Sequence, residues 1–270
     1  MNRVVLVAGA SSGVGRDAAA SLAARGHTVY GTSRDVTRVD APGVTPVALE
    51  VTDDRSVRAC VEEVVERAGG IDAVVYSAGF YVAGSAEETD PELAIAQLDA
   101  YLVGAHRLVR AVLPHMRRRG GGRLLLMSST AAVAAIPFHS VYSASKAALN
   151  HYAEALRYEV EPFGVRVACV EATSVRTGAA TALRTGAPLP VYQPVRDKVL
   201  DRFRRLQLEG PEPTAVSREI VRAVEARRMR PLYRVGLQAK TLPVLRAVLP
   251  RRLFAHLYGR FFGLGRPPGD

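Results

Sequence analysis

The residues of this chain best suited to chemistry are Tyr142 and Lys146, which lie four positions apart in the stretch YSASK. Residues at this spacing share one face of a helix. A lysine ammonium beside a phenol favours the phenolate, so the pair predicts a tyrosine whose pKa falls from about 10 toward the neutral range. Only three lysines occur among the 270 residues, so a chance pairing with a tyrosine is uncommon.

Ser129 lies thirteen residues before Tyr142, just after the apolar run at 124–127. A serine hydroxyl in such a position can hold a carbonyl oxygen while a phenol gives that oxygen a proton. The three side chains together therefore predict proton transfer to a ketone as a hydride arrives at its carbon.

A second group of residues has the form of a phosphate-binding loop. The stretch AGASSGVG, residues 8–15, follows an apolar run at 4–7 and precedes a helical stretch over 16–25. Glycine permits positive φ and close approach of the backbone, and the N–H groups at a helix N-terminus suit a pyrophosphate. Taken alone, the loop fits a tight strand-to-helix turn equally well.

The elements that must position these residues follow from the hydrophobic periodicity. Segments with helical apolar spacing, such as 54–68 and 91–119, separate short apolar runs. These runs cover residues 4–7, 28–31, 46–51, 73–76, 124–127 and 165–170. The alternation predicts the α/β class: a single-domain, Rossmann-type doubly wound parallel sheet with helices on both faces. The stretch PLYRVG at 231–236 predicts an edge strand, which gives about seven strands.

In an open sheet of this kind, ligands bind beyond the carboxyl ends of the strands. The stretch GTSRD places Ser33 and Arg34 directly after the second run, where a dinucleotide-binding protein contacts the adenosine ribose. An arginine there matches a 2′-phosphate, so the sequence favours NADP(H) over NAD(H). The alternative is an ordinary solvated arginine.

With these motifs, residues 3–177 resemble the short-chain dehydrogenase/reductase family. The family's glycine loop matches residues 8–15 with Ala8 in place of a threonine, and its catalytic Ser, Tyr and Lys match Ser129, Tyr142 and Lys146. The resemblance implies that Lys146 also binds the nicotinamide ribose. The cofactor-binding residues that it implies are Gly9, Ser11, Ser12, Gly13, Val14, Gly15, Ser33, Arg34, Glu50, Val51, Ser77, Ala78, Gly79, Tyr142, Lys146, Val175 and Thr177.

Three departures from the family pattern bear on function. Tyr101 stands where the family has a fourth catalytic residue, an asparagine that holds a water linking the lysine to solvent. Tyr101 offers a hydroxyl and no amide, so the proton relay is rerouted, slowed or absent. Ala172 and Thr173 replace Pro-Gly beside the nicotinamide, which changes the backbone conformations allowed there. Ser77 replaces an asparagine that ties the central strands together.

The leading hypothesis is an NADP(H)-dependent oxidoreductase that interconverts a ketone and a secondary alcohol on a hydrophobic small molecule, acting as a ketoreductase. Tyr142 would be its general acid/base. A weaker likeness of the C-terminal portion implies steroid-, retinoid- or polyketide-like ketones. The departures keep two alternatives open: a non-redox relative acting as a cyclase, isomerase or dehydratase, and a non-catalytic cofactor-binding protein.

Composition argues against several other classes. The net charge of +10 does not predict a nucleic-acid partner, because the arginines are spread over helix faces without interleaved aromatic residues. Two cysteines give no disulfide framework and no signal peptide is visible, so we expect a cytoplasmic protein. His139 has no companions at metal-ligand spacing, so we expect no metal site.

We expect one domain over residues 1–270. In it, 3–177 form the cofactor-binding and catalytic core, 178–210 a substrate lid with loop character, and 211–270 the edge strand and C-terminal helices. Within this last part, Thr214 is the expected N-cap of a helix. We assign substrate choice to the lid and to Phe80, Tyr81, Ile136, Phe138 and His139.

The C-terminal segment 242–262 is amphipathic and helical in pattern, with expected interruptions at Pro243 and Pro250. Two interpretations stay open: the segment packs on the body or on a partner subunit, or it makes a weak contact with a membrane surface. The family resemblance further implies a homodimer or homotetramer packed through the helices at 91–119 and 142–163.

Overall fold

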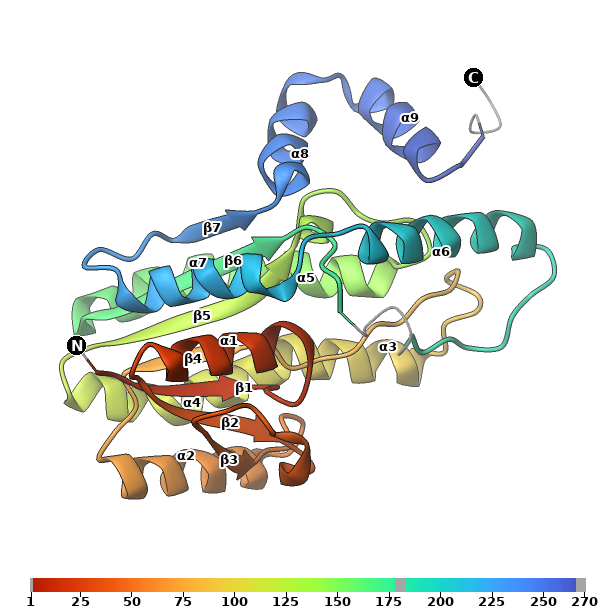
Figure 1. The fold of residues 1–270 in the computed structure, drawn as a ribbon. Coiled ribbons are helices and arrows are strands. Elements are labelled where there is room, and N and C mark those ends of the chain that lie inside the picture. The colour runs from red at the N-terminus through yellow and green to blue at the C-terminus, as the bar shows by residue number, and fades with distance from the viewer. Residues whose placement is uncertain (1, 178–182, 266–270) are drawn as a thin grey trace.

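The computed structural model describes residues 2–177 and 183–265, and a single parallel sheet lies at its centre (Figure 1). The strand order is β3-β2-β1-β4-β5-β6-β7, and every neighbouring pair is parallel. The strands are β1 (Val4–Ala8), β2 (Thr28–Ser33), β3 (Val44–Ala48), β4 (Ala73–Tyr76), β5 (Gly122–Ser129), β6 (Val165–Ala172) and β7 (Leu232–Val235). The predicted seven-stranded, doubly wound sheet is confirmed, including the edge strand β7.

The central strands are continuous apolar runs because both faces of the sheet are covered. Side chains alternate between two cores: Leu6 and Val74 point into one, and Val5 and Val75 into the other. The first core is closed by α2 (Asp54–Ala68), α4 (Gly104–Arg118) and α5 (Ser140–Val160), and the second by α1 (Gly13–Ala24) and α7 (Pro213–Glu225). This layering leaves the carboxyl ends of the strands as the open edge.

The amphipathic stretch over 91–119 is not one regular helix. It consists of α3 (Pro91–Leu98), a five-residue π-helix η2 (Asp99–Val103) and α4. Such π-turns often lie at functional sites. Short 3₁₀ turns complete the connections, as η1 (Val36–Arg38), η3 (Thr130–Ala132) and η4 (Glu161–Phe163).

Three expected boundaries were wrong. The third strand ends at Ala48, so Glu50 and Val51 lie in the turn after it. Helix α7 has Glu212 as its N-cap and begins at Pro213, the residue type whose fixed φ suits a first helical position, so Thr214 lies inside the helix. The segment expected as a loop-like lid contains the helix α6 (Gln193–Leu208), whose apolar face is buried. Residues 178–182 of that segment lie outside the described part of the chain.

Two further helices follow β7 and project from the body of the molecule (Figure 1). They are α8 (Leu237–Val248) and α9 (Arg251–Phe261). Pro250 separates them, as expected, whereas Pro243 lies inside α8 and does not interrupt it. Across residues 2–177 and 183–265, no helix has both the length and the apolar character needed to cross a membrane.

Candidate active site

The glycine loop joins β1 to α1 and packs against the turn that follows β4. Gly9 has a φ of 84°, and a Cβ there would lie 2.9 Å from backbone atoms of Ala78. A Cβ on Gly15 would lie 2.0 Å from the carbonyl oxygen of Gly9. Side chains at either position would therefore force the loop open, which explains why the sequence uses glycine there.

The N-terminus of α1 has the properties of an anion-binding site. Its N-cap, Ser12, makes no side-chain capping hydrogen bond, and the first turn holds no acidic residue. The N–H groups of that turn and the positive end of the helix dipole are therefore left for an external acceptor. The predicted residues from Gly9 to Gly15 thus fit the pyrophosphate of a dinucleotide. Thr177 lies beside them, with its methyl group 3.3 Å from where a Cβ on Gly13 would stand.

Arg34 and Glu50 occupy the carboxyl ends of β2 and β3, where we expected the adenosine end of the cofactor. The Arg34 Nε atom lies 3.9 Å from a Glu50 carboxylate oxygen, and the Arg34 side chain is 67% exposed. The Glu50 carboxylate is oriented by the backbone N–H and the hydroxyl of Thr52, at 3.0 and 2.8 Å. An exposed ion pair of this length is weak. Arg34 can therefore turn from Glu50 to a phosphate at little cost.

The four predicted catalytic residues come together at the end of β5. Ser129 is the last residue of β5, Tyr142 and Lys146 lie on one face of α5, and Tyr101 comes from the π-helix η2. The Ser129 hydroxyl lies close enough to the Tyr142 phenol to act against the rise of its pKa. The Lys146 Nζ atom lies 3.8 Å from the centroid of the Tyr101 ring and 5.9 Å from that of Tyr142. The sequence spacing thus predicted a real cluster.

The electrostatics of this cluster differ from expectation. Lys146 is buried and donates to the carbonyl oxygen of Met127 at 2.7 Å, and burial lowers the pKa of its ammonium to about 7. Burial also raises the pKa of Tyr142 well above 10, and the neighbouring Tyr81 and Tyr101 add to that shift. The expected depression of the Tyr142 pKa by Lys146 is therefore wrong for this structure. The reason is that two aromatic rings desolvate the phenol and the lysine points to a carbonyl.

Tyr81 covers the catalytic tyrosine, a role that the sequence did not indicate. Its ring stacks on the Tyr142 ring with centroids 4.6 Å apart, and the Tyr142 hydroxyl donates to the Tyr81 hydroxyl at 3.4 Å. Backbone hydrogen bonds tie the turn that carries Tyr81 to Arg184 beyond the undescribed residues. Tyr81 thus occupies the position in front of the Tyr142 hydroxyl.

Tyr76 is a second functional residue that sequence reasoning missed. Its hydroxyl, buried at the end of β4, donates to the carbonyl oxygen of Ala100 at 2.5 Å. This hydrogen bond ties the end of β4 to the π-helix that carries Tyr101. Gly104 makes this possible, because a Cβ there would lie 2.5 Å from the Tyr76 hydroxyl.

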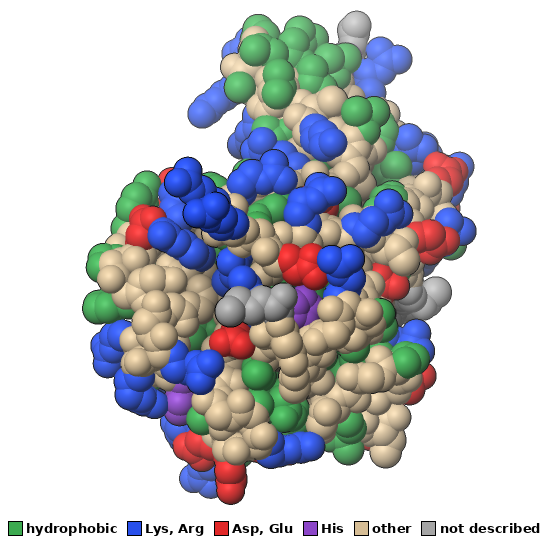
Figure 2. All heavy atoms as spheres, turned by 60° about the vertical axis from the view of Figure 1, so that its left-hand side comes forward, with side chains coloured by type: hydrophobic (Ala, Val, Ile, Leu, Met, Phe, Trp, Pro, Cys, Tyr) green, Lys and Arg blue, Asp and Glu red, His purple; other side chains and the backbone are tan. Residues whose placement is uncertain are grey.

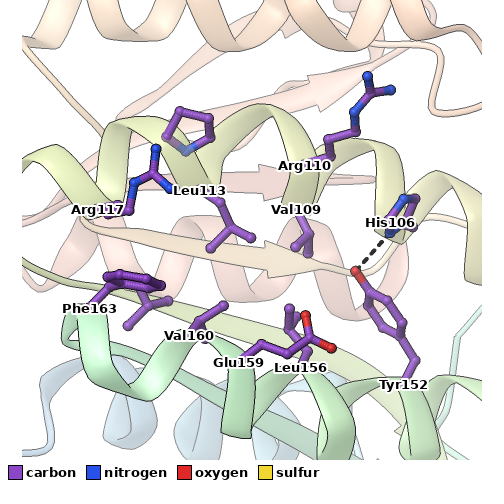
Figure 3. Close-up of a pocket in the computed structure, with 12 residues that line it drawn as sticks. His106, Val109, Arg110, Leu113, Arg117, Tyr152, Leu156, Glu159, Val160 and Phe163 are labelled. Carbon is purple, nitrogen blue, oxygen red and sulfur yellow. Dashed lines mark hydrogen bonds between the residues drawn. The ribbon is translucent and has the colours of Figure 1, made fainter.

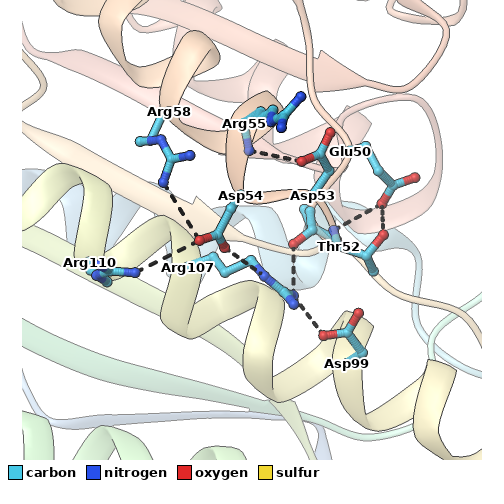
Figure 4. A network of polar contacts seen from close by, with 10 residues as sticks. Glu50, Thr52, Asp53, Asp54, Arg55, Arg58, Asp99, Arg107 and Arg110 are labelled. Atoms are coloured by element: carbon cyan, nitrogen blue, oxygen red, sulfur yellow. Dashed lines mark hydrogen bonds and ion pairs between the residues drawn. The ribbon is translucent and has the colours of Figure 1, made fainter.

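Arg107 connects the π-helix to the adenosine end of the site (Figure 4). Its guanidinium pairs with Asp54 at 2.9 Å and with Asp99 at 2.6 Å, and it donates to the carbonyl oxygen of Val51 at 3.4 Å. Only 20% of the Arg107 side chain is exposed, so these contacts are partly shielded from water. One side chain therefore holds α2, the turn after β3 and the first residue of η2 together.

An aromatic wall stands beside Tyr142. Its two aromatic residues are Phe203 from α6 and Phe262, just after α9, and Ala131 and Ile136 complete it. All four are buried in one cluster with Tyr101 and Tyr142. His139 lies behind it with its ring 4.4 Å from that of Phe203, and burial lowers its pKa to about 4. The structure groups no three potential metal ligands in the residues it describes.

The end of β6 is tied to the C-terminal helices. The hydroxyl of Thr173 donates to the side-chain oxygen of Gln238 on α8 at 2.7 Å. A Cβ on Gly236, whose φ is 93°, would lie 2.3 Å from the Thr173 methyl group. The residues that replace Pro-Gly therefore pack against the segment after β7. Val175, two residues further on, is buried in the second core.

Comparisons with known proteins agree with this geometry. The family model for short chain dehydrogenases matches residues 3–187. The chain is 36% identical over 176 residues to a 3-ketodihydrosphingosine reductase of Bacteroides thetaiotaomicron, covering 65% of each chain. It is 34% identical over 189 residues to human 17-beta-hydroxysteroid dehydrogenase type 1, covering 64% of this chain and 57% of that one. The aligned part thus spans less than two thirds of either relative.

A solved short-chain dehydrogenase from Streptomyces avermitilis is 31% identical and superimposes with a TM-score of 0.82, covering 92% of each chain. Residues 3–187 contain the glycine loop, strands β1 to β6 and the Ser129, Tyr142 and Lys146 cluster described above. The sheet order, the loop and the family match agree, and the chain belongs to the short-chain dehydrogenase family, an oxidoreductase family that uses NAD(P)(H).

Proposed function

We propose that this protein is an NADP(H)-dependent ketoreductase that interconverts a ketone and a secondary alcohol on a hydrophobic small molecule. The observation that carries the proposal is the meeting of Ser129, Tyr142 and Lys146 at the carboxyl end of β5. The aromatic wall beside Tyr142 suits an apolar substrate. The 3-ketodihydrosphingosine and 17-beta-hydroxysteroid relatives support a bulky, lipid-like ketone.

Each residue of the cluster has a defined task in this proposal. Bound NADPH supplies the hydride. The Ser129 hydroxyl donates a hydrogen bond to the carbonyl oxygen, and the Tyr142 phenol gives that oxygen its proton. The Tyr81 hydroxyl now accepts from Tyr142, so the substrate oxygen replaces Tyr81 as the acceptor. Lys146, once turned from the Met127 carbonyl toward Tyr142, would favour the phenolate that proton transfer leaves behind.

The preference for NADPH over NADH rests on Arg34 at the end of β2. Its guanidinium is exposed, and its contact with Glu50 is long. A contact with a 2′-phosphate is charge-assisted, and at an exposed position one such hydrogen bond contributes about 1.5–3 kcal/mol. Arg34→Ala should therefore weaken NADPH binding roughly tenfold to a hundredfold. It should leave NADH binding unchanged.

Titration of nicotinamide fluorescence tests this preference. The matched control is Arg228→Ala, which removes the same charge from an exposed position before β7, at the opposite edge of the sheet. Equal losses of affinity for NADPH and for NADH in Arg34→Ala would refute the assignment of the 2′-phosphate site. Tyr142→Phe should retain NADPH binding and lose ketone reduction. Full activity in that variant would refute the proposed chemistry.

A second candidate is non-redox chemistry in the same cleft, such as isomerisation, cyclisation or dehydration. The covering of Tyr142 by Tyr81 and the presence of Tyr101 favour it, because they raise the pKa of the phenol. Conversion of substrate with no change in NADPH absorbance would identify this alternative. Binding of NADPH without any conversion would instead indicate a cofactor-binding protein.

For the assembly we propose a homodimer or homotetramer that uses α4 and α5. A hollow of about 360 Å³ lies between these helices (Figure 3). Its lining includes Val109, Leu113, Leu156 and Val160, with Phe163 at one end, and it contains none of the catalytic residues. Sedimentation equilibrium tests this, since Leu113→Glu should yield monomers. We also propose a cytoplasmic protein, which agrees with two buried, unpaired cysteines, and no nucleic-acid partner.

A further inference from the structure

Helices α8 and α9 present an apolar surface that faces away from the protein body. On α8, Leu237, Val244 and Val248 are 76%, 59% and 69% exposed, and they recur at the spacing of one helix face. On α9, Leu253 and Leu257 repeat the pattern at 44% and 50% exposure. Hydrophobic side chains exposed at this density mark an interaction surface. Figure 2 shows hydrophobic side chains gathered with Lys and Arg at the top of the molecule.

The C-terminal part of the chain that includes these helices carries the whole excess of positive charge, and five of its cations lie in α8 and α9. Residues 226–269 contain ten Lys and Arg and no Asp or Glu, so the rest of the chain has 26 residues of each sign. Lys240, Arg251, Arg252 and Arg260 are exposed and form no ion pair with any residue that the structure describes. By helical spacing, Lys240 flanks the α8 stripe and Arg252 and Arg260 flank the α9 stripe. Lysine and arginine side chains at such positions can keep their charged ends in a polar environment while the apolar side chains beside them enter an apolar one.

The opposite faces of the two helices hold them on the body. The Tyr258 hydroxyl donates to the carbonyl oxygen of Ala134 at 3.0 Å, and Arg246 donates to the carbonyl oxygen of Val133. Phe262, just after α9, is buried in the aromatic wall. The apolar stripes are therefore presented outward by an anchored pair of helices, next to the wall of the active site.

We propose that α8 and α9 dock the protein on the surface of an anionic lipid bilayer. An apolar stripe flanked by arginines is the pattern of a helix lying in the membrane interface, and anionic headgroups complement a surface that has no acidic residue. A second copy of the chain fits less well. A symmetric dimer would place this surface against itself and bring its cations together.

Vesicle flotation of the full chain tests the proposal without using its activity. We expect binding to vesicles of phosphatidylcholine mixed with phosphatidylglycerol, and weaker binding to pure phosphatidylcholine. Arg251→Gln with Arg252→Gln should lower binding to the mixed vesicles roughly thirtyfold, since each cation near an anionic surface contributes about fivefold. Binding to pure phosphatidylcholine should not change.

The apolar contribution is tested by Leu253→Glu with Leu257→Glu, which should lower binding to both kinds of vesicle at least tenfold. The matched control is Val191→Glu with Leu208→Glu, at positions that are 77% and 66% exposed outside the two helices. Circular dichroism checks that both variants are folded. No binding of the wild type to mixed vesicles, or equal losses in the two double variants, would overturn the proposal. Self-association that Leu253→Glu with Leu257→Glu abolishes, without vesicle binding, would assign the surface to a second copy.

Discussion

Tyr101 is expected to act on Lys146 through its ring and not through its hydroxyl, and two substitutions separate these roles. The Lys146 Nζ atom lies 3.8 Å from the ring centroid. The Tyr101 hydroxyl makes no hydrogen bond to any residue in the described part of the chain. Tyr101→Phe should therefore change the free energy of unfolding by less than about 0.5 kcal/mol. Tyr101→Leu removes the π-face and should cost about 2 kcal/mol more, the size of a desolvated cation–π contact.

The effect of Tyr101→Leu should depend on pH, because only the ammonium form of Lys146 interacts with the ring. The pKa of Lys146 is about 7, so its charged form predominates at pH 5 and its neutral form at pH 9. A loss of about 2 kcal/mol from the charged form lowers the pKa of Lys146 by about 1.5 units. The stability difference between the Phe and Leu variants should thus be largest at pH 5. At pH 9 only the packing difference should persist.

Urea unfolding of both variants at the two pH values measures this difference, with the pH profile of kcat/KM as a second readout. In the profile, the limb assigned to Lys146 should move to lower pH in Tyr101→Leu alone. A difference in unfolding free energy between the two variants that is the same at both pH values would refute the cation–π account. A loss of more than tenfold in kcat/KM for Tyr101→Phe would show that the hydroxyl relays protons after all.

Three further predictions concern packing, a buried ion pair and pH. Gly104→Ala should lower the unfolding free energy by about 1–3 kcal/mol, because the added Cβ meets the Tyr76 hydroxyl. Gly259→Ala on α9 has room for its Cβ and should be neutral or stabilising by up to about 1 kcal/mol. Equal changes of unfolding free energy in the two variants, measured by urea unfolding, would contradict this prediction. Arg196→Met leaves Glu88, whose side chain is 2% exposed, without its ion-pair partner, so it should lower the unfolding free energy by about 3 kcal/mol and increase protease cleavage near 183–192. Adding Glu88→Gln should recover part of that stability. An unchanged cleavage rate would count against the ion pair as an anchor of α6. The folded pKa of Lys146 lies below its unfolded value of about 10.4, so the unfolded state binds more protons between pH 7 and 9. Wild-type stability should therefore rise by about 2.3 kcal/mol over that range relative to Lys146→Met. Parallel stability curves for the two proteins would argue against the low pKa.

The parts of the fold that the sequence predicted are those determined locally. Short apolar runs bounded by turn residues are typical of buried strands in a parallel sheet, so all seven strands were identified with small errors at their ends. Glycines at 9 and 15 were informative because the backbone of their own loop excludes a Cβ. The helix α6 was missed because three prolines at 188, 190 and 194 masked its start, and its buried face depends on distant partners.

The candidate site was predicted in its members but not in its electrostatics. Helical spacing placed Tyr142 and Lys146 on one face, which is a local property. The pKa values of both depend on Tyr81 and Tyr101, which arrive from other elements and desolvate the pair. The π-helix likewise depends on a hydrogen bond from Tyr76, twenty-four residues earlier in the chain. No pattern within one segment could reveal these contacts.

The separation of charge along the chain makes the molecule an electric dipole. Its positive part is residues 226–269, which include the projecting helices α8 and α9, and the rest of the chain has equal numbers of acidic and basic residues. In an external field such a molecule experiences a torque as well as an attraction, so it turns before it arrives. At low ionic strength, where the Debye length is about 30 Å at 0.01 M, this orientation begins at a distance comparable to the size of a domain. The protein should therefore approach any negatively charged surface or resin with its C-terminal end first.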